Sequence, residues 1–246
     1  QMLWAGGNAV DAAVAMAIAL TVVEPTSNGI GSDAFALVWD GKLQGLNASG
    51  KSAQSLSLEH FTGRMRIPDR GWLPVTVPGA VSAWKSLWQR WGSLPFEQLF
   101  EPAIHYAEQG FPVSPETARA WNRAAQVFLP LTEPEFQPFK AVFFAGGQAP
   151  QAGELWRSPF HAQTLRAIAE SHGESFYRGA LAQRITDFAA QTGGLLTAAD
   201  LAQHQPEWVE PISTAYRDYT VWEMPPNGQG LAALIALNLL EGFDLG

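Results

Sequence analysis

The sequence contains no cysteine and carries few charges. Its 246 residues include 15 basic and 23 acidic side chains, only 15% of the chain, with a net charge of −8. The missing cysteine excludes disulfides, thiol nucleophiles, iron–sulfur clusters and zinc bound by thiolates. No basic run is present, and sequence-independent nucleic-acid binding needs clustered lysine and arginine. No nucleic-acid partner is therefore expected.

Short metal-binding and nucleophile motifs are also missing. None of the five histidines lies within five residues of another, so no local metal motif exists. There is no GxSxG nucleophile elbow, and the scattered carboxylates show no pairing that would suit a glycosidic bond. No metal and no cofactor are therefore expected.

The chain is rich in apolar residues instead. Hydrophobic residues make up 47% of it, including ten tryptophans and fourteen phenylalanines. This balance is typical of a folded globular protein rather than a disordered one. The aromatic residues indicate large buried contacts, within the chain or with another subunit.

Residues 8–23, NAVDAAVAMAIALTVV, predict a buried helix. Asn8 can cap the first turn, Asp11 completes a box-like start, and Glu24-Pro25 ends the helix. Apolar residues cover every side, which is typical of a helix buried all round. Because the segment is short and carries Asp11 in its first turn, we expect a core helix and no membrane partner.

A β-hairpin is predicted after this helix. Residues 34–39 form an uninterrupted apolar run, as expected for a strand that is covered on both faces. Asp40-Gly41 is a strong signal for a type I′ turn, so the second strand is expected over about 42–48.

The remaining elements follow in an irregular order. Prolines and glycines punctuate residues 129–154, which predicts a long loop or hairpin region. The mixture of helices and hairpins indicates α+β layers rather than regular βαβ alternation. Helices are expected from 77–79 to about 91, from Pro95, from Pro115, near Pro159, near Ala180 and over 229–241, with a strand over 216–224.

Residues 45–52, GLNASGKS, match the phosphate-binding pattern GxxxxGK[ST]. That loop binds phosphates because its backbone N–H groups and its lysine surround them at a helix N-terminus. Here the first glycine lies in the return strand of a hairpin, and no long helix is expected after Ser52. A nucleotide-binding protein is therefore a weaker alternative.

Several long segments resemble the γ-glutamyltranspeptidase family. The first is AGGNAVDAAVAMAIALTVVEPTSNGIGSDAFALVWDG, residues 5–41. The GIGSDAFALVWDG part is similar to a bacterial branch of γ-glutamyltranspeptidase-like and cephalosporin-acylase-like proteins. Several motifs in one order are more specific than one short pattern, so the chain is identified as a member of this family. The other segments are residues 71–84, 95–115, 176–185 and 193–245.

The resemblance implies an αββα sandwich of the N-terminal-nucleophile hydrolase type, incomplete in this chain. Residues 1–246 would be a single-domain portion of the large subunit of a precursor that cuts itself. The implied partners are the self-cleaved small subunit and a small-molecule γ-glutamyl substrate such as a glutathione-like donor. The N-terminal threonine of the small subunit would attack the amide with its own amine as base, and an oxyanion hole would stabilise the intermediates. The acyl group would then pass to water or to an amino acid or peptide.

No catalytic residue is expected within this chain. In the family the nucleophilic threonine lies beyond the motif that ends near Gly246, and both ends of the sequence are expected to lie inside a longer chain. Thr26, Thr76 and Thr197 are not candidates, because they stand in motifs typical of a strand, a loop and a helix cap.

The resemblance points to Gly50 and Lys51 as the substrate-binding positions. The large subunit of typical members supplies an arginine that grips the α-carboxylate of the γ-glutamyl group, since its planar fork binds a carboxylate bidentately. Matching ASGKSAQS, residues 48–55, places Gly50 at the arginine position with Lys51 beside it. Lys51 would bind the carboxylate as a point charge, or the γ-glutamyl specificity would be lost.

Two alternatives therefore stay open beside γ-glutamyl transfer. One is an amidase or acylase of the same fold that acts on glutaryl or other acyl groups. The other is a non-catalytic homologue that binds or scaffolds. The compartment is not indicated by the sequence.

Overall fold

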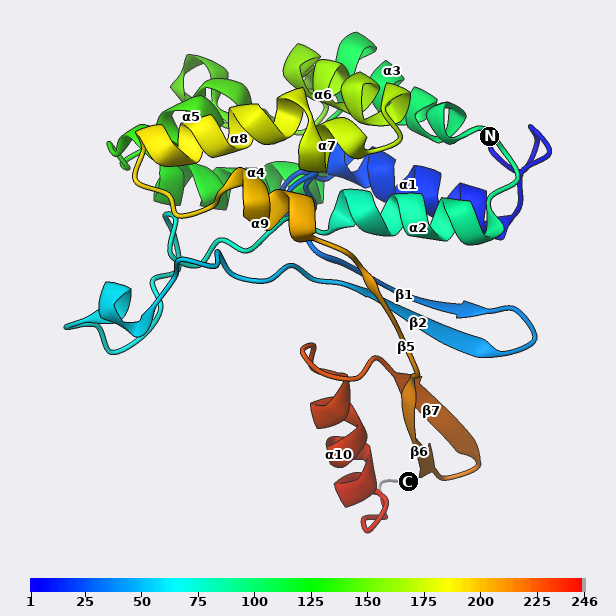
Figure 1. Cartoon of the computed structure of the whole chain (residues 1–246). Coiled ribbons are helices and arrows are strands. Elements are labelled where there is room, and N and C mark those ends of the chain that lie inside the picture. The colour runs from blue at the N-terminus through cyan, green and yellow to red at the C-terminus, as the bar shows by residue number, and fades with distance from the viewer. Residues whose placement is uncertain (245–246) are drawn as a thin grey trace.

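The computed structural model describes residues 1–244 as a thick helical layer over a small sheet (Figure 1). The helices are α1 (Ala9–Val23), α2 (Ala80–Trp91), α3 (Glu101–Gln109), α4 (Pro115–Phe128), α5 (Gln137–Phe143), α6 (Pro159–Glu170), α7 (Glu174–Arg178), α8 (Ala180–Gln191), α9 (Ala198–Gln203) and α10 (Gly230–Leu240). The short 3₁₀ helices are η1 (Leu58–Phe61), η2 (Phe96–Phe100), η3 (Pro134–Phe136) and η4 (Ala145–Gly147).

The strands form small antiparallel groups, so the chain has a mixed helix and strand fold. The main sheet has the order β1-β2-β5, while β3 pairs with β4 and β6 pairs with β7. In Figure 1 the β6–β7 hairpin and α10 stand below the main sheet, away from the helical layer. The strands are β1 (Ala34–Trp39), β2 (Leu43–Ala48), β3 (Phe111–Pro112), β4 (Leu155–Trp156), β5 (Glu207–Val209), β6 (Ile212–Tyr216) and β7 (Tyr219–Glu223).

Helix α1 begins as predicted, with Asn8 and Asp11 forming a reciprocal capping box. The Asp11 side chain is fully buried, and it also accepts a hydrogen bond from the Ser93 N–H at 3.1 Å. The helix packs against α2 and α3. Its expected burial on every side is only partly correct, because Met16 and Leu20 are exposed.

The predicted hairpin is present, but its turn differs from the expected one. Trp39 pairs with Leu43, so the connection is three residues long, and only Gly41 adopts a positive φ (+73°). A type I′ turn would need positive φ at two residues. The expected cover on both faces of β1 is also wrong for the described residues, because Phe35, Leu37 and Trp39 are exposed.

Helix α2 covers one face of the main sheet. Ala83 in α2 packs with Leu46 and Ala48 of β2, and all three are almost completely buried. On its other side α2 places Val81 and Trp84 in the main core of the helical layer. Helix α2 therefore packs on two sides.

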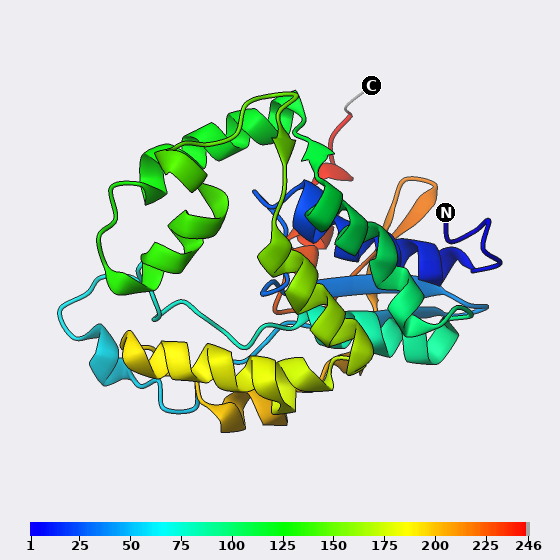
Figure 2. The same cartoon turned by 90° about the horizontal axis from the view of Figure 1, so that it is seen from above.

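Two regions depart from the sequence-based expectations: residues 129–154, and residues 216–224, where the single predicted strand contains the turn between β6 and β7. Residues 129–154 contain the short helix α5 as well as loops, and Figure 2 shows this green part of the chain arching away from the rest of the layer. Pro138 lies in the first turn of α5, where a helix tolerates proline. Within residues 1–244, no helix combines the length and the apolar character that crossing a membrane requires.

Candidate substrate-binding site

The segment after β2 carries Gly50 and Lys51, and neighbouring segments hold its backbone. The Val77 N–H donates to the Lys51 carbonyl at 2.9 Å. The Gly50 N–H donates to the Asp33 carboxylate, Oδ1, at 3.2 Å. The backbone that carries the Lys51 side chain is therefore tied to the loops before β1 and before α2.

Two glycines allow these backbones to come this close. A Cβ atom on Gly50 would lie 1.6 Å from the Val77 carbonyl oxygen, and one on Gly79 would lie 1.6 Å from the Ala48 carbonyl oxygen. No side chain fits at position 50 on this backbone. Any part that Gly50 takes in binding is therefore through its backbone conformation.

An open groove of about 850 Å³ extends from Lys51. The Lys51 ammonium has no hydrogen-bond or ion-pair partner within the described part of the chain, so its charge is available. A carboxylate bound beside Lys51 would meet a free cation, although Asp200 and Glu207 also line the groove. The groove is lined by Ser49, Lys51, Ser52, Ala53, Gln54, Leu56, Val77, Asp200, Gln203, His204, Gln205, Pro206 and Glu207.

His204 forms part of the groove wall and links it to α2. It follows the last turn of α9, and its Nε2 lies 2.9 Å from the Ser82 hydroxyl. Burial lowers the pKa of His204 below its usual value, against the opposing effect of the Asp33 carboxylate. The imidazole is therefore neutral near pH 7, with one nitrogen engaged by Ser82.

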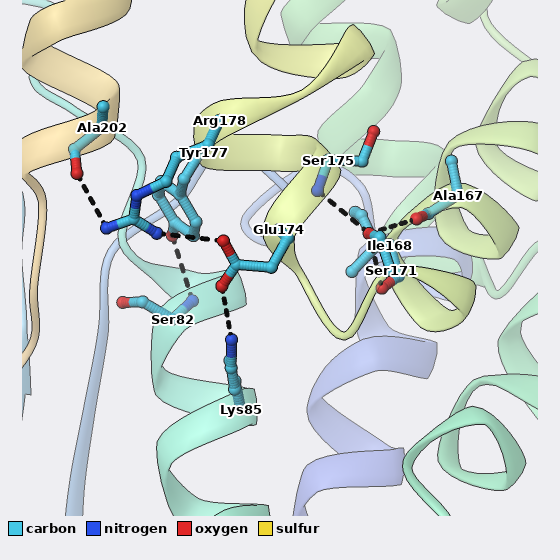
Figure 3. A network of polar contacts seen from close by, with 10 residues as sticks. All are labelled: Ser82, Lys85, Ala167, Ile168, Ser171, Glu174, Ser175, Tyr177, Arg178 and Ala202. Atoms are coloured by element: carbon cyan, nitrogen blue, oxygen red, sulfur yellow. Dashed lines mark hydrogen bonds and ion pairs between the residues drawn. The ribbon is translucent and has the colours of Figure 1, made fainter.

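Tyr177 completes this network from α7. Its hydroxyl donates to the Pro78 carbonyl at 2.8 Å and accepts a hydrogen bond from the Ser82 N–H at 3.0 Å, the latter drawn in Figure 3. Burial raises the pKa of Tyr177 to about 12, so the hydroxyl stays protonated as a donor. The ring of Tyr177 stacks on that of His204, with centroids 5.3 Å apart.

Sequence reasoning missed this network. Ser82 lies 95 residues from Tyr177 and 122 residues from His204 in the chain, so no local spacing joins them. Ser82 and His204 are not arranged as a nucleophile and its base. The Ser82 hydroxyl donates to the Gly79 carbonyl at 2.6 Å and is buried, so it presents no attacking oxygen to a substrate.

The three threonines set aside from the sequence do not form a nucleophilic centre. Thr26 donates its hydroxyl proton to the Glu24 carboxylate, and Thr197 caps α9 in a box with Asp200. Thr76 stands in a short antiparallel bridge. Among residues 1–244, no three histidine, aspartate or glutamate side chains gather to hold a metal ion.

The phosphate-binding pattern of residues 45–52 does not lie between a parallel strand and a long helix, as a P-loop does. Its first part lies in β2, an antiparallel strand, and residues 49–57 lead to the one-turn η1 rather than to a long helix. The Gly50 N–H, which would face a phosphate, instead binds the Asp33 carboxylate. Without a helix N-terminus and a free Gly50 N–H, this pattern is not a P-loop.

A second cavity, of about 750 Å³, lies beside the loop that follows α1. Phe139 and Phe143 of α5 and Phe160 and His161 of α6 make much of its wall, which is mostly apolar. Burial lowers the pKa of His161 to about 4, so its imidazole is neutral near pH 7. No charged group of this cavity would attract a carboxylate, and the Lys51 groove remains the better candidate.

Comparison with known proteins gives one consistent result. The family model described as Gamma-glutamyltranspeptidase matches residues 1–246. The glutathione hydrolase-like YwrD proenzyme of Bacillus subtilis is 36% identical over 249 residues, which cover 99% of this chain and 46% of that protein. The chain thus spans about half the length of the curated relatives that it matches.

Solved structures agree with the sequence comparison. The cephalosporin acylase of Bacillus halodurans superposes with a TM-score of 0.95 at 55% identity, covering 99% of this chain and 46% of that one. The γ-glutamyltranspeptidase of Helicobacter pylori superposes with a TM-score of 0.90 at 31% identity, covering 100% of this chain and 71% of that one. The arrangement of helices and strands is therefore shared with both.

Proposed function

This chain belongs to the γ-glutamyltranspeptidase family, and from that premise we propose that it is part of an enzyme that cleaves γ-glutamyl amide bonds. The acyl group of a glutathione-like donor would pass to water or to an amino acid or peptide. The observation that carries the proposal is the free Lys51 ammonium in the wall of an open groove, where a substrate carboxylate would be bound.

The nucleophile would come from a second subunit released when a precursor cuts itself. The relatives named as proenzymes support this, and so does the apolar surface that this chain leaves open. Phe35, Leu37 and Trp39 of β1 are exposed on one face of the main sheet. A second sheet packed there would bury them and complete an αββα sandwich, to which residues 1–246 would contribute as part of a single domain.

Lys51 would bind the carboxylate of the acyl group as a point charge. An ammonium group offers three donors without the rigid fork of arginine, so it would hold the carboxylate less selectively. Gly50 would serve the same site by letting the backbone lie against Val77. Substrate binding at these two positions is inferred from the groove and from the family pattern.

A second candidate function is hydrolysis of glutaryl or related acyl amides. The identity to a cephalosporin acylase favours it, because that protein shares more than half of its aligned residues with this chain. The two candidates differ in the α-amino group, which a γ-glutamyl donor has and a glutaryl donor lacks.

The first test is made on the full-length gene product. Intact-mass analysis should show two polypeptides, the smaller one beginning with threonine. Steady-state kinetics would then compare a γ-glutamyl anilide with a glutaryl anilide. A kcat/KM higher for the γ-glutamyl anilide supports the proposal, whereas a preference for the glutaryl anilide establishes the second candidate. A single uncleaved chain without turnover contradicts both and favours a binding protein.

The role of Lys51 is tested by Lys51→Met. Loss of one charge-assisted contact should raise KM by about 10-fold, with a smaller change in kcat. Lys42→Met is the matched control, because Lys42 is an exposed lysine that pairs with Glu210 at the edge of the main sheet. Equal effects of the two substitutions would show that Lys51 does not bind the substrate.

A further inference from the structure

The backbone that carries the Lys51 side chain is bonded to a segment distant in the sequence. Lys51 follows β2, and its carbonyl accepts a hydrogen bond from Val77, in the Val77–Gly79 turn before α2. The same turn approaches Ala48 and Gly50 so closely that no side chain fits at Gly79 or Gly50. A shift of the turn would therefore shift the Lys51 backbone.

Two side chains hold this turn from outside, and a third contacts one of them. The Tyr177 hydroxyl donates to the Pro78 carbonyl, and the Ser82 hydroxyl donates to the Gly79 carbonyl. His204 Nε2 lies 2.9 Å from the same Ser82 oxygen. Because the Ser82 proton is directed to Gly79, the His204 N–H is the donor in this second contact. Both consecutive carbonyls of the turn are thus fixed by α2 and α7.

Two of these side chains are themselves well anchored. Ser82 and Tyr177 are buried, and the Tyr177 ring stacks on the His204 ring. Figure 3 shows that α7 is also tied to α2 and α9 by neighbouring contacts. Glu174 accepts hydrogen bonds from Lys85 at 2.7 Å and from Arg178 at 3.2 Å, and Arg178 donates to the Ala202 carbonyl at 2.8 Å.

We propose that Tyr177, Ser82 and His204 are positioning residues for the Lys51 site, acting through the Val77–Gly79 turn; His204 also lies in the wall of the groove. The proposal rests on the proposed role of Lys51 in carboxylate binding. It adds that the affinity of the site depends on α7 and α9, which lie more than 120 residues beyond Lys51 in the chain. Tyr177 and Ser82 lie outside the groove lining, and their contribution is to fix the backbone that carries the Lys51 side chain.

The test is a double-mutant cycle on the full-length gene product. Tyr177→Phe removes one hydroxyl and keeps the ring, and it should raise KM for the γ-glutamyl anilide about 3- to 10-fold, with kcat within about 2-fold. In the double variant with Lys51→Met, the effect of Tyr177→Phe should disappear, because its action passes through Lys51. Tyr106→Phe, at an exposed tyrosine of α3, is the matched control.

A second variant separates positioning from general stability. His204→Gln keeps an N–H near the Ser82 oxygen and should retain a nearly normal KM, whereas His204→Ala should raise it. Multiplicative effects of Tyr177→Phe and Lys51→Met would overturn the proposal. So would a KM that His204→Gln and His204→Ala change equally.

Failure of the proposed function is distinguishable from failure of this inference. If the enzyme prefers glutaryl amides, the proposed function fails and the same cycle is measured with the glutaryl anilide. If the protein shows no turnover, hydrogen exchange provides the test. Tyr177→Phe should speed exchange in peptides covering 49–53 and 75–79 and leave α1 unchanged, and unchanged exchange in both peptides would overturn the proposal.

Discussion

Helices α1 and α10 have nearly the same sequence character but different surroundings. Both are apolar on almost every side, and neither carries a basic residue in its last turn. Helix α1 lies within the helical layer and buries six of its residues, whereas α10 buries only Gly230 and Leu234. Leu231, Ile235 and Leu239 of α10 are exposed.

The difference shows what an apolar pattern does and does not determine. An apolar pattern indicates that a helix is buried, but it does not indicate which part of a protein packs against it. Helix α1 is covered by α2 and α3 of the same chain, and the main contacts of α10 are with the β6–β7 hairpin. The exposed side of α10 and the exposed face of β1 are the surfaces that the proposed second subunit would bury.

The largest expected effect is a difference in folding stability between equivalent substitutions in α1 and α10. Ile18→Ala in α1 should lower the free energy of unfolding of residues 1–246 by about 2–5 kcal/mol, because Ile18 is 0% exposed and its removal leaves a cavity. Ile235→Ala in α10 should lower it by less than about 1 kcal/mol, because Ile235 is 51% exposed. Urea unfolding measures both.

The same two substitutions, made in the full-length gene product, would show whether a second subunit covers α10. If a second subunit covers α10, Ile235→Ala should then destabilise the protein by about 2 kcal/mol or more. An unchanged small effect would mean that α10 faces solvent in the complete protein.

An effect of intermediate size is expected on the pH dependence of folding stability, through His161 in the helical layer. Burial lowers the pKa of His161 to about 4, below its unfolded value of 6.5. As pH falls from about 6.5 to 4, the unfolded chain binds a proton that the folded chain does not, so stability decreases over this window. His161→Phe should remove about 1–3 kcal/mol of this loss, since one pKa unit corresponds to about 1.4 kcal/mol.

The control for this prediction is His60→Phe, at an exposed position outside the helical layer. Urea unfolding at several pH values between 4 and 7 would compare the two variants with the wild type. Equal pH slopes for His161→Phe and the wild type would show that the imidazole is not held neutral by the fold.

The smallest effects are expected from exposed ion pairs. Glu174→Gln should lower the free energy of unfolding by about 0.5–1 kcal/mol at pH 7, and Lys42→Gln by less than about 0.5 kcal/mol. Glu174 joins Lys85 and Arg178 in one network, whereas Lys42 has a single exposed partner, Glu210. Thermal unfolding at low and high salt would separate these values.

The Glu174 contribution should also depend on pH. The Lys85 hydrogen bond, with a further one from Arg178, lowers the pKa of Glu174 below its unfolded value of 4.5. Its stabilisation is therefore complete above that value and is lost as pH falls through the folded pKa. A difference between Glu174→Gln and the wild type that persists at pH 2 would contradict this assignment.

The local elements of the fold were predictable from the sequence. The capping boxes of Asn8 with Asp11 and of Thr197 with Asp200 are both present, because each needs only residues three positions apart. The hairpin of β1 and β2 was predictable because its strand and turn signals are adjacent in the sequence. Its turn has one residue more than expected. Family membership was likewise evident from long motifs in one order, and the family comparison confirms it.

The arrangement around Lys51 was decided by the tertiary structure alone. The sequence placed Gly50 and Lys51 side by side, but the contact of Gly50 with Val77 and the link from Ser82 to His204 join distant segments. Local periodicity does not indicate which distant residues come into contact, because many tertiary arrangements are compatible with the same pattern. The sequence by itself indicated most of the helices and the β1–β2 hairpin, because these depend on local patterns, while packing decided which backbone holds the lysine and which apolar faces stay open.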